Sequence, residues 1–292
     1  MRHEAHSALE PPGLSMDLAQ DAALALMPAV RKAAREAGRI ACRYFRRGAR
    51  TSARVWSKHG GSPVTEADVA VDSFLKVRLA ETLPDAAWLS EETADDPARL
   101  KARRLWIVDP IDGTRAFLSG HPDWSVAIAL LIDGEPALGV VHAPAHGDGG
   151  TLYEACRRGG AFRAGARIAV SQAAALRGAR IAGPKPLIDR LQRSAGPLSP
   201  VERIPSLALR LARVAEGTVD LGLVSSNARD WDIAAADLIL TEAGGHLTTF
   251  EGGRPRYNQA EPVHGELLAA PRALHPRLVE AMTGRSPSAA AL

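Results

Sequence analysis

Acidic residues occur at three separated places in the sequence, and each place follows or flanks an apolar run. Glu91 and Glu92 follow AAWLS, Asp109 and Asp112 follow RLWIV in the stretch WIVDPIDGTRAF, and Asp232 comes after the apolar segment LGLV. Taken singly, these acids fit an exposed loop, an Asp-Gly turn and a helix N-cap. Taken together, they fit the ends of elements that meet in one crevice of a layered α/β fold.

Carboxylates gathered in one crevice need cations beside them. Two carboxylates about 4 Å apart repel by roughly 4 kcal/mol at an effective dielectric constant near 20. Four of them would raise their pKa values or unfold the site unless positive charge lay between them. All-oxygen ligands select hard ions, and Mg²⁺ usually leaves positions for water and phosphate oxygens. The acids therefore predict a Mg²⁺ site that handles a phosphate ester.

The elements around these acids are predicted to be helices first and strands next. Residues 17–47 have a helical pattern, and Thr65 is typical of an N-cap, with Asp68 three residues on in a capping box. RLWIVD is typical of a buried strand, and WSVAIALLIDGEPALGVVHAP of a hairpin that turns at Asp133-Gly134. Strands and helices then alternate to the end of the chain, which predicts an α/β (α+β) fold.

A change of composition near residues 145–165 suggests two halves. Residues 16–150 are expected to form an α+β half with the first two acidic motifs, and residues 151–283 an α/β half with the third motif and the substrate pocket. Gly-rich hairpin loops inside one domain would produce the same change. Residues 1–15 and 284–292 are expected to be flexible tails.

The composition argues against several classes of protein. The chain has 292 residues, 46% apolar and 24% charged, and no apolar run approaches the roughly 20 residues that cross a bilayer. Its amino terminus lacks the apolar stretch of a secretory signal, so we expect a cytoplasmic protein. Cys42 and Cys156 belong to no CxxC motif and lie in no His-rich stretch, which argues against a zinc site. The net charge is +3, but the basic residues are scattered along the sequence. We therefore expect no binding to a nucleic-acid polymer.

Three motifs in this chain resemble those of the inositol monophosphatase superfamily. WLSEET matches the acidic pair, DPIDGT matches D-P-[IL]-D-G-[ST], and WDIAAADLILTEAGG matches W-D-x-[AT]-[AG], in the family's order and at similar spacing. The resemblance covers the chain from about residue 20 to 280 and is strongest to the 3′(2′),5′-bisphosphate nucleotidase branch. It implies a layered α/β/α/β/α sandwich, a homodimer, and a lithium-sensitive phosphomonoesterase with two to three Mg²⁺ ions per site.

The same resemblance suggests metal ligands residue by residue. Glu91, Asp109 and the Ile111 carbonyl look like ligands of a first ion. Asp109, Asp112 and Asp232 look like ligands of a second. With two ions between a water and the phosphate, the resemblance implies that no protein nucleophile is needed.

Further residues carry over with other roles. Asp68 matches a residue that holds a third ion through water, although the capping box alone would explain it. Thr114 matches the residue that, with Glu91, orients and helps deprotonate the attacking water. The backbone amides of Gly113 and Thr114 are suited to donate hydrogen bonds to phosphate oxygens. Asp112, which precedes them, is also expected in the substrate site.

Two arginines bear on the choice of substrate. Arg115 directly follows DPIDGT, and Arg210 lies four residues before VAEG, where the nucleotidases of the superfamily carry Lys. A second phosphate needs a second cationic partner, and Arg offers a bidentate one. We therefore predict hydrolysis of adenosine 3′,5′-bisphosphate to AMP and phosphate, with Ser206 and Asp232 also in the pocket. Solvated helix positions would explain both arginines equally well.

Other functions stay open. SLALR departs from the nucleotidases' Gly-Ser-Ser-Leu-Lys pattern. An inositol-1-monophosphatase is therefore an alternative, as is another sugar or polyol phosphatase that acts on histidinol phosphate or fructose bisphosphate. In that case Asp230 would bind a sugar hydroxyl. Haloacid-dehalogenase-type phosphatases carry an aspartyl nucleophile in the pattern DxDG[TV], with the second aspartate two residues later, whereas Asp109 and Asp112 are three residues apart, which argues against that class. A catalytically silent metal- or anion-binding protein is a further class, and the retention of Glu91 and Thr114 argues against it.

Overall fold

The computed structural model describes residues 12–57 and 63–284. Among these residues, no helix combines the length and the apolar character that crossing a bilayer requires. The helices are α1 (Pro12–Cys42), α2 (Glu66–Thr82), the 3-10 helix η1 (Pro97–Lys101), α3 (Thr114–Ser119), α4 (Lys185–Ala195), α5 (Leu207–Ala215), α6 (Asp230–Glu242) and α7 (His275–Thr283).

Within the described part of the chain, the strands form two main sheets and two small ones. The first sheet contains, in spatial order, β3 (Ala87–Ser90), β4 (Arg104–Asp112), β5 (Ser125–Ile132), β6 (Glu135–Ala143), β7 (Thr151–Cys156), β8 (Gly160–Arg163) and β9 (Ala166–Ile168). The second contains β11 (Ser199–Pro200), β10 (Arg180–Ala182), β12 (Leu221–Val224), β16 (Leu267–Pro271) and β14 (Gly245–Thr249). The small sheets pair β1 (Val55–Ser57) with β2 (Pro63–Thr65), and β13 (Ala228–Arg229) with β15 (Val263–His264).

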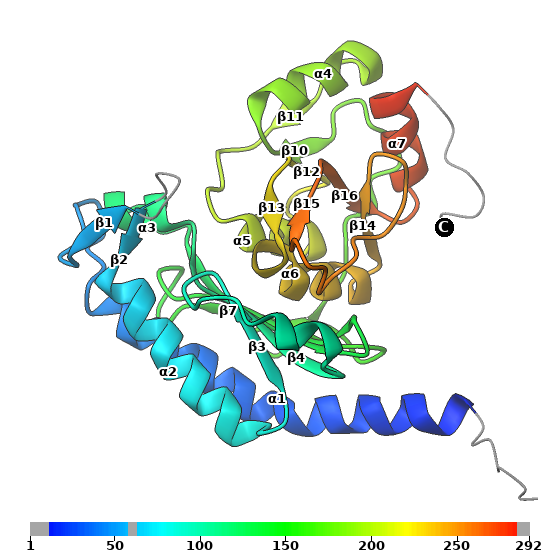
Figure 1. The fold of residues 1–292 in the computed structure, drawn as a ribbon. Coiled ribbons are helices and arrows are strands. Elements are labelled where there is room, and N and C mark those ends of the chain that lie inside the picture. Colours follow the sequence, from blue (N-terminus) through cyan, green and yellow to red (C-terminus); the bar gives the residue numbers. More distant parts are fainter. Residues whose placement is uncertain (1–11, 58–62, 285–292) are drawn as a thin grey trace, which may run out of the picture.

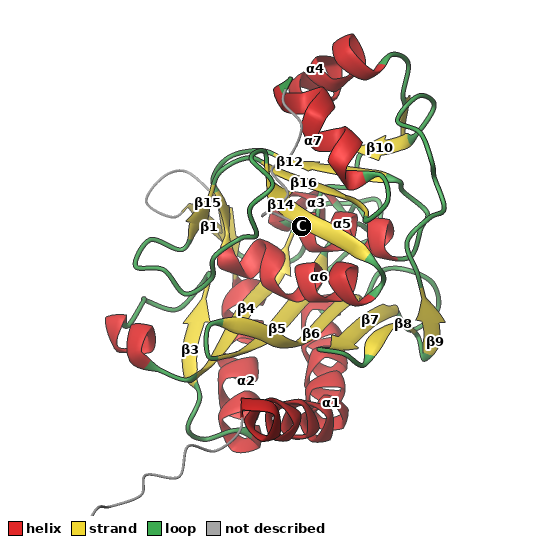
Figure 2. Cartoon of the chain, turned by 90° about the vertical axis from the view of Figure 1, so that its right-hand side faces the viewer, coloured by secondary structure: helices red, strands yellow, loops and turns green. Residues whose placement is uncertain are grey.

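The elements stack in five alternating layers of helix and sheet (Figure 1, Figure 2). α1 and α2 cover one face of the first sheet, α5 and α6 lie between the two sheets, and α4 and α7 cover the outer face of the second. Each sheet face and each apolar helix face is thereby buried against a neighbouring layer. This arrangement confirms the predicted α/β/α/β/α sandwich.

β4 shows why its sequence is apolar on both sides. Trp106 and Val108 pack toward α1 and α2, whereas Leu105 and Ile107 pack toward the middle layer. Successive side chains of a strand point to opposite faces, and here both faces are covered by helices. The continuous run LWIV before Asp109 is therefore required by burial on both faces.

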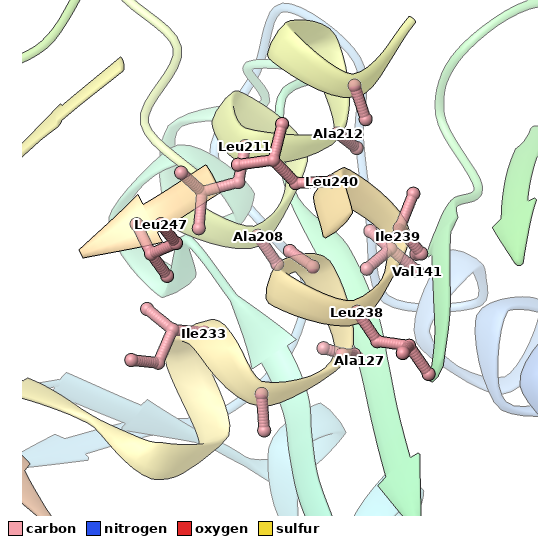
Figure 3. Close-up of a cluster of buried hydrophobic side chains, with 14 of the residues drawn as sticks. Ala127, Val141, Ala208, Leu211, Ala212, Ile233, Leu238, Ile239, Leu240 and Leu247 are labelled. Carbon is pink, nitrogen blue, oxygen red and sulfur yellow. The ribbon is translucent and has the colours of Figure 1, made fainter. Parts of the chain in front are cut away.

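The middle layer holds the two sheets together (Figure 3). Side chains of α5 and α6 pack with Ala127 and Val141 of the first sheet and Leu247 of the second. A Cβ added at Gly139 on β6 would lie 2.5 Å from the carbonyl oxygen of Ala235 on α6. The small residues in WDIAAAD thus allow α6 to lie close against the first sheet, which brings its N-terminus to the end of β4.

Local predictions hold at several element ends. Thr65 is the N-cap of α2, with its hydroxyl accepting from the Ala67 amide at 3.1 Å and the Asp68 carboxylate closing the capping box. Asp133 and Gly134 have φ values of 53° and 82° and join β5 to β6, as an Asp-Gly hairpin turn requires.

The boundaries between the two halves differ from the prediction. β7, β8 and β9 belong to the first sheet, although residues 151–168 were expected in the second half. The change from one sheet to the other occurs between Ile168 and Arg180, because the Gly-rich segments near 147–165 are turns within the first sheet. Of the expected tails, residues 12–15 lie in α1 and residue 284 is the C-cap of α7; the rest lie outside the described residues.

Candidate active site

Glu91 and Asp109 are neighbours because β3 and β4 run parallel. Ser90 pairs with Val108 at the end of β3, and the backbone nitrogen of Glu91 lies 3.4 Å from the Val108 carbonyl oxygen. Parallel strands bring their carboxyl ends to the same edge of the sheet. The residue that follows β3 therefore lies beside the first acid of DPIDGT, although the two are separated in sequence by η1.

A bulge in β4 turns Asp109 and Asp112 to one side. Residues three apart in a regular strand point to opposite faces. Asp109 pairs with Ala127 and Asp112 pairs with Ser125, so three steps along β4 oppose two steps along β5. The extra residue falls in the segment that contains Pro110, and it restores the common orientation of the two carboxylates.

Asp232 joins this pair from the N-terminal turn of α6. Its Oδ2 accepts a hydrogen bond from the Arg229 amide at 2.6 Å, which holds the side chain at the start of the helix. One carboxylate oxygen from each of Asp109, Asp112 and Asp232 lies within 4.8 Å of the others. The structure thus brings together three acids from two chain segments more than a hundred residues apart.

The site is electrostatically costly without cations. Burial, followed by the charges of Glu91, Asp112, Asp232 and Asp68, raises the pKa of Asp109 well above its usual value. Burial and the neighbouring Asp112 raise the pKa of Asp232 to about 8. Such shifts are expected where carboxylates share a water-poor site. They show that Glu91 and Asp68 belong to the same electrostatic cluster as the three closest acids.

Asp68 has a structural role and also faces this cluster. Its side chain is buried, and Oδ2 accepts from the Thr65 amide at 2.8 Å in the capping box of α2. Its charge also contributes to the raised pKa of Asp109 after the larger effect of burial. The two expectations for Asp68 are therefore compatible in one position.

Asp112 is held by the N-terminus of α5. Its oxygens accept hydrogen bonds from the Leu207 amide at 3.1 Å, the Ala208 amide at 2.7 Å and the Ser206 hydroxyl. Ser206 was expected to touch the substrate. Its side chain is fully buried, caps α5 through the Leu209 amide, and donates to Asp112. We therefore correct its role to that of an anchor for Asp112.

The turn after Asp112 depends on a glycine. Gly113 has φ 89°, a backbone conformation that residues with a side chain rarely adopt, and a Cβ there would lie 3.1 Å from the Asp123 carbonyl oxygen. The Thr114 hydroxyl donates to the Ile111 carbonyl oxygen at 3.1 Å. The tight turn therefore places this carbonyl and hydroxyl together, directly after the two acids of β4.

The two arginines expected in the pocket lie in different surroundings. Arg115 is exposed in the first turn of α3. Arg210 is half-buried, and its guanidinium donates to the carbonyl oxygens of Ile204 at 3.0 Å and Leu223 at 3.2 Å. Burial lowers the pKa of Arg210, and the Asp112 charge opposes that shift. Arg210 thus stands near the acidic cluster with its orientation set by backbone acceptors.

Arg210 also lines a cavity of about 520 Å³. Besides Arg210, its walls include Arg203, Lys185, Glu202 and Ser225. The sequence analysis did not single out Lys185 or Arg203, because nothing in the local pattern distinguishes them from the scattered basic residues elsewhere. Only the fold shows that they share a cavity with Arg210.

Asp230 does not face this cavity. Its side chain is completely buried; Oδ1 lies 2.7 Å from His264 Nε2, and Oδ2 accepts from the Asn258 amide at 2.8 Å. The suggestion that Asp230 binds a sugar hydroxyl is therefore wrong, because both of its oxygens are engaged within the protein.

The donor set of the acidic cluster fits hard divalent ions. Its members offer carboxylate and carbonyl oxygens, and no His or Cys joins the three closest acids among the described residues. Carboxylates that burial and mutual repulsion drive toward protonation gain most from a cation, because the cation removes the repulsion. The cluster is therefore suited to oxygen-preferring ions and unsuited to a zinc site of the thiolate type.

Comparison with known proteins supports this chemistry. The inositol monophosphatase family matches residues 25–285. The chain is 37% identical over 192 residues to the fructose-1,6-bisphosphatase/inositol-1-monophosphatase of Thermotoga maritima, covering 65% of this chain and 72% of that protein. It is 36% identical to the histidinol-phosphatase of Mycobacterium tuberculosis, covering 76% and 85%. It is 35% identical to the 3′-phosphoadenosine 5′-phosphate phosphatase of Mycobacterium bovis, covering 74% and 80%.

The fold gives the same answer. The crystal structure of the extragenic suppressor protein suhB from Bartonella henselae superimposes with a TM-score of 0.77 at 30% identity, covering 89% of this chain and 98% of that one. Members of the matched family are phosphatases that use divalent metals and act on small phosphorylated compounds. The chain belongs to the inositol monophosphatase family and is a metal-dependent phosphoric monoester hydrolase.

Proposed function

We propose that this protein is a Mg²⁺-dependent 3′(2′),5′-bisphosphate nucleotidase that converts adenosine 3′,5′-bisphosphate to AMP and phosphate. The single observation that supports this choice is a cavity lined by both Arg203 and Arg210, of which Arg210 lies close enough to Asp112 for the two charges to interact. A monophosphate needs cations at one place only, whereas a bisphosphate needs a second cationic partner some distance from the first.

The acidic cluster supports the metal-binding part of the proposal. Glu91, Asp109 and the Ile111 carbonyl would hold a first ion, and Asp109, Asp112 and Asp232 a second. When bound, two divalent ions lower the pKa of a water and offset charge on the phosphate. The chain itself would orient the reactants through its rigid turn and its helix N-termini.

Asp68 would hold a third ion through water. Thr114, whose hydroxyl points to the Ile111 carbonyl, would orient the attacking water together with Glu91. The amides of Gly113 and Thr114 would hold phosphate oxygens at the turn after Asp112. No protein nucleophile is needed in this scheme.

The charge balance of the cavity supports a second anionic group. Arg203 lies near enough for its charge to lower the pKa of Arg210, after the larger effect of burial. No salt bridge to another described residue is found for either arginine. Lys185 is paired with Asp189 at 2.7 Å on the exposed side. Two arginines that line one cavity and form no salt bridge within the described part of the chain are typical of an anion site.

Glu202 on the same cavity favours a second candidate. A carboxylate there would suit a phosphate ester that carries an amine or several hydroxyls, such as histidinol phosphate or a sugar phosphate. The relatives with those names make this the strongest alternative.

A substrate panel tests the proposal. The protein is incubated with adenosine 3′,5′-bisphosphate, inositol 1-phosphate, fructose 1,6-bisphosphate and histidinol phosphate, in Mg²⁺, in EDTA, and in Mg²⁺ with Li⁺. We expect release of phosphate from the nucleotide at a kcat/KM at least about tenfold above the others, which corresponds to about 1.4 kcal/mol. EDTA and Li⁺ should each abolish it. A higher kcat/KM for any of the other esters would reject the nucleotidase assignment and leave the phosphatase intact.

Variants at the cavity refine this test. Arg203→Ala should raise KM for the bisphosphate about tenfold and leave KM for 2′-AMP or 3′-AMP within twofold, because only the former carries a second phosphate. Arg193→Ala, on the exposed surface of α4, is a matched loss of one arginine. Equal effects of Arg203→Ala on both kinds of substrate would contradict the second-anion role.

We also propose that the protein is a homodimer and is located in the cytoplasm. Light scattering of the purified protein tests the homodimer.

A further inference from the structure

The acidic cluster is assembled from two parts of the fold that share no sheet. Glu91 follows β3 of the first sheet, whereas Asp232 lies in the first turn of α6, the helix that leads into the second sheet. Carboxylates brought this close repel one another. Packing of α6 against the first sheet brings the start of α6 to β4, and polar contacts between the Glu91 segment and α6 would fix their separation against this repulsion.

A buried arginine lies at this junction. Arg99 in η1 is 1% exposed, although arginine is rarely so deeply buried without partners. Its Nε and Nη2 donate to the two oxygens of Asp95 at 2.6 and 2.8 Å, as a bidentate fork. Its Nη1 points the other way and donates to Asn258 Oδ1 at 2.7 Å and to the Gln259 carbonyl oxygen at 3.1 Å.

Asn258 completes the link in both directions. Its Nδ2 donates back to the Arg99 carbonyl oxygen at 3.1 Å, and its backbone amide donates to Asp230 Oδ2 at 2.8 Å. Asn258 has φ 55°, a left-handed conformation in which Asn is favoured among residues with a side chain. The conformation directs the amide toward Asp230 while the side chain returns to Arg99.

Asp230 lies two residues before Asp232 in the first turn of α6. Its second oxygen lies 2.7 Å from His264 Nε2 on β15, so it is fixed from both sides. The hydrogen bonds therefore run without a break from Asp95, four residues after Glu91, through Arg99 and Asn258 to the helix turn that carries Asp232. Arg99 also attracts the Asp230 charge.

We propose that Arg99 and Asn258 are positioning residues that clamp the Glu91 segment to the start of α6 and so set the affinity of the metal site. Neither belongs to the ligand set, and both act through the residues that they hold. The inference rests on the proposed metal ligands, and it predicts that loosening the clamp weakens metal binding. Groups that hydrogen-bond metal ligands directly commonly change metal affinity 10- to 100-fold, and Arg99 and Asn258 act one step further away, through Asp95 and Asp230.

Two variants test the clamp by complementary routes. Asn258→Gly removes the side-chain hydrogen bonds to Arg99 but keeps the left-handed backbone and its amide, because glycine adopts that conformation freely. Arg99→Lys keeps the positive charge but loses the fork that reaches two partners at once. Each should raise the dissociation constant for Mn²⁺, measured by calorimetry on the metal-free protein, about tenfold.

Two controls separate the clamp from general destabilisation. Arg31→Lys disrupts another bidentate pair, that of Arg31 with Glu154 at 2.7 Å, between α1 and β7. Leu278→Ala opens the core under α7, where Leu278 is fully buried. Both should lower the melting temperature and leave the Mn²⁺ dissociation constant within twofold of the unaltered protein.

The outcomes are distinct. Weaker Mn²⁺ binding in Asn258→Gly and Arg99→Lys, with unchanged binding in both controls, supports the clamp. Unchanged binding in a folded Asn258→Gly protein overturns it, and so does an equal loss of affinity in Leu278→Ala. If the unaltered protein binds no Mn²⁺, the proposed metal site fails and the clamp fails with it. A substrate other than the nucleotide would reject the proposed function while leaving the clamp standing.

Discussion

Replacing Asp109 by Asn should stabilise the metal-free protein while abolishing its activity. Asp109 is buried, and an oxygen of each of its neighbours Asp112 and Asp232 lies within 4.8 Å of one of its own. Asn keeps an oxygen in place of Oδ1, which accepts from the Ile111 amide at 3.0 Å, so the local backbone keeps its hydrogen bond. The change therefore removes one charge from the cluster with little change of shape.

The size of the effect follows from Coulomb's law. Two full charges about 4.8 Å apart repel by roughly 3.5 kcal/mol at an effective dielectric constant near 20. Shared protons reduce the charge, because burial and the neighbouring acids raise the pKa of Asp109. We expect a net gain of about 1 to 3 kcal/mol. For a chain of this length that corresponds to a rise in melting temperature of about 2 to 6 °C.

The assay is thermal unfolding in EDTA at about pH 8.5, repeated with saturating Mg²⁺. Mg²⁺ should stabilise the unaltered protein strongly and Asp109→Asn little, so the order of the two melting temperatures should reverse. Asp220→Asn is the control with the opposite sign. Asp220 is paired with Arg180 at 2.7 Å, and that pairing with other hydrogen bonds lowers its pKa against the effect of burial, so the loss of its charge should destabilise the fold. A lower melting temperature for metal-free Asp109→Asn would refute the reasoning.

Three further predictions concern the chemistry and the pH response. Thr114→Ala should lower kcat about 100-fold with KM nearly unchanged, whereas Thr114→Ser keeps the hydroxyl and the rate; steady-state kinetics that show full kcat for the alanine variant would remove its role. Mg²⁺ binding near pH 7 should release protons, because Asp109 and Asp232 have raised pKa values; calorimetry in two buffers of different ionisation enthalpy measures the number, and zero would contradict the shifts. Burial lowers the pKa of His275 to about 4, so its contribution should destabilise the fold progressively as pH falls from about 6.5 to 4, by up to about 3 kcal/mol, and His275→Gln should flatten that part of the stability curve measured by urea unfolding.

Local patterns in the sequence predicted those features that short-range physics decides. The Thr65 cap needs only a side-chain oxygen at the right step before a helix, and the Asp133-Gly134 turn needs only two residues that tolerate positive φ. The apolar run before Asp109 follows from burial of a strand on both faces. Each of these depends on residues close together in the chain.

Long-range packing decided what the sequence left open. Ser206 was expected to touch substrate and instead anchors Asp112, because α5 docks its N-terminus on β4. Under the alternative of a sugar phosphatase, Asp230 was expected to bind a sugar hydroxyl, and its side chain is instead enclosed by His264 and Asn258. The spacing of these residues along the chain does not distinguish a residue that holds a site residue in place from a residue that lines the substrate pocket.

The sequence by itself determined which chemical groups are available: oxygen ligands at three motifs, a glycine turn beside them, and apolar segments long enough to build the layers. The tertiary structure alone decided that a bulge turns Asp109 and Asp112 to the same side, and that α6 adds Asp232 to the pair. It also alone placed Arg203 beside Arg210. The physical reason is that residue type sets what an atom can bind, whereas the distance between atoms remote in sequence depends on how whole layers pack.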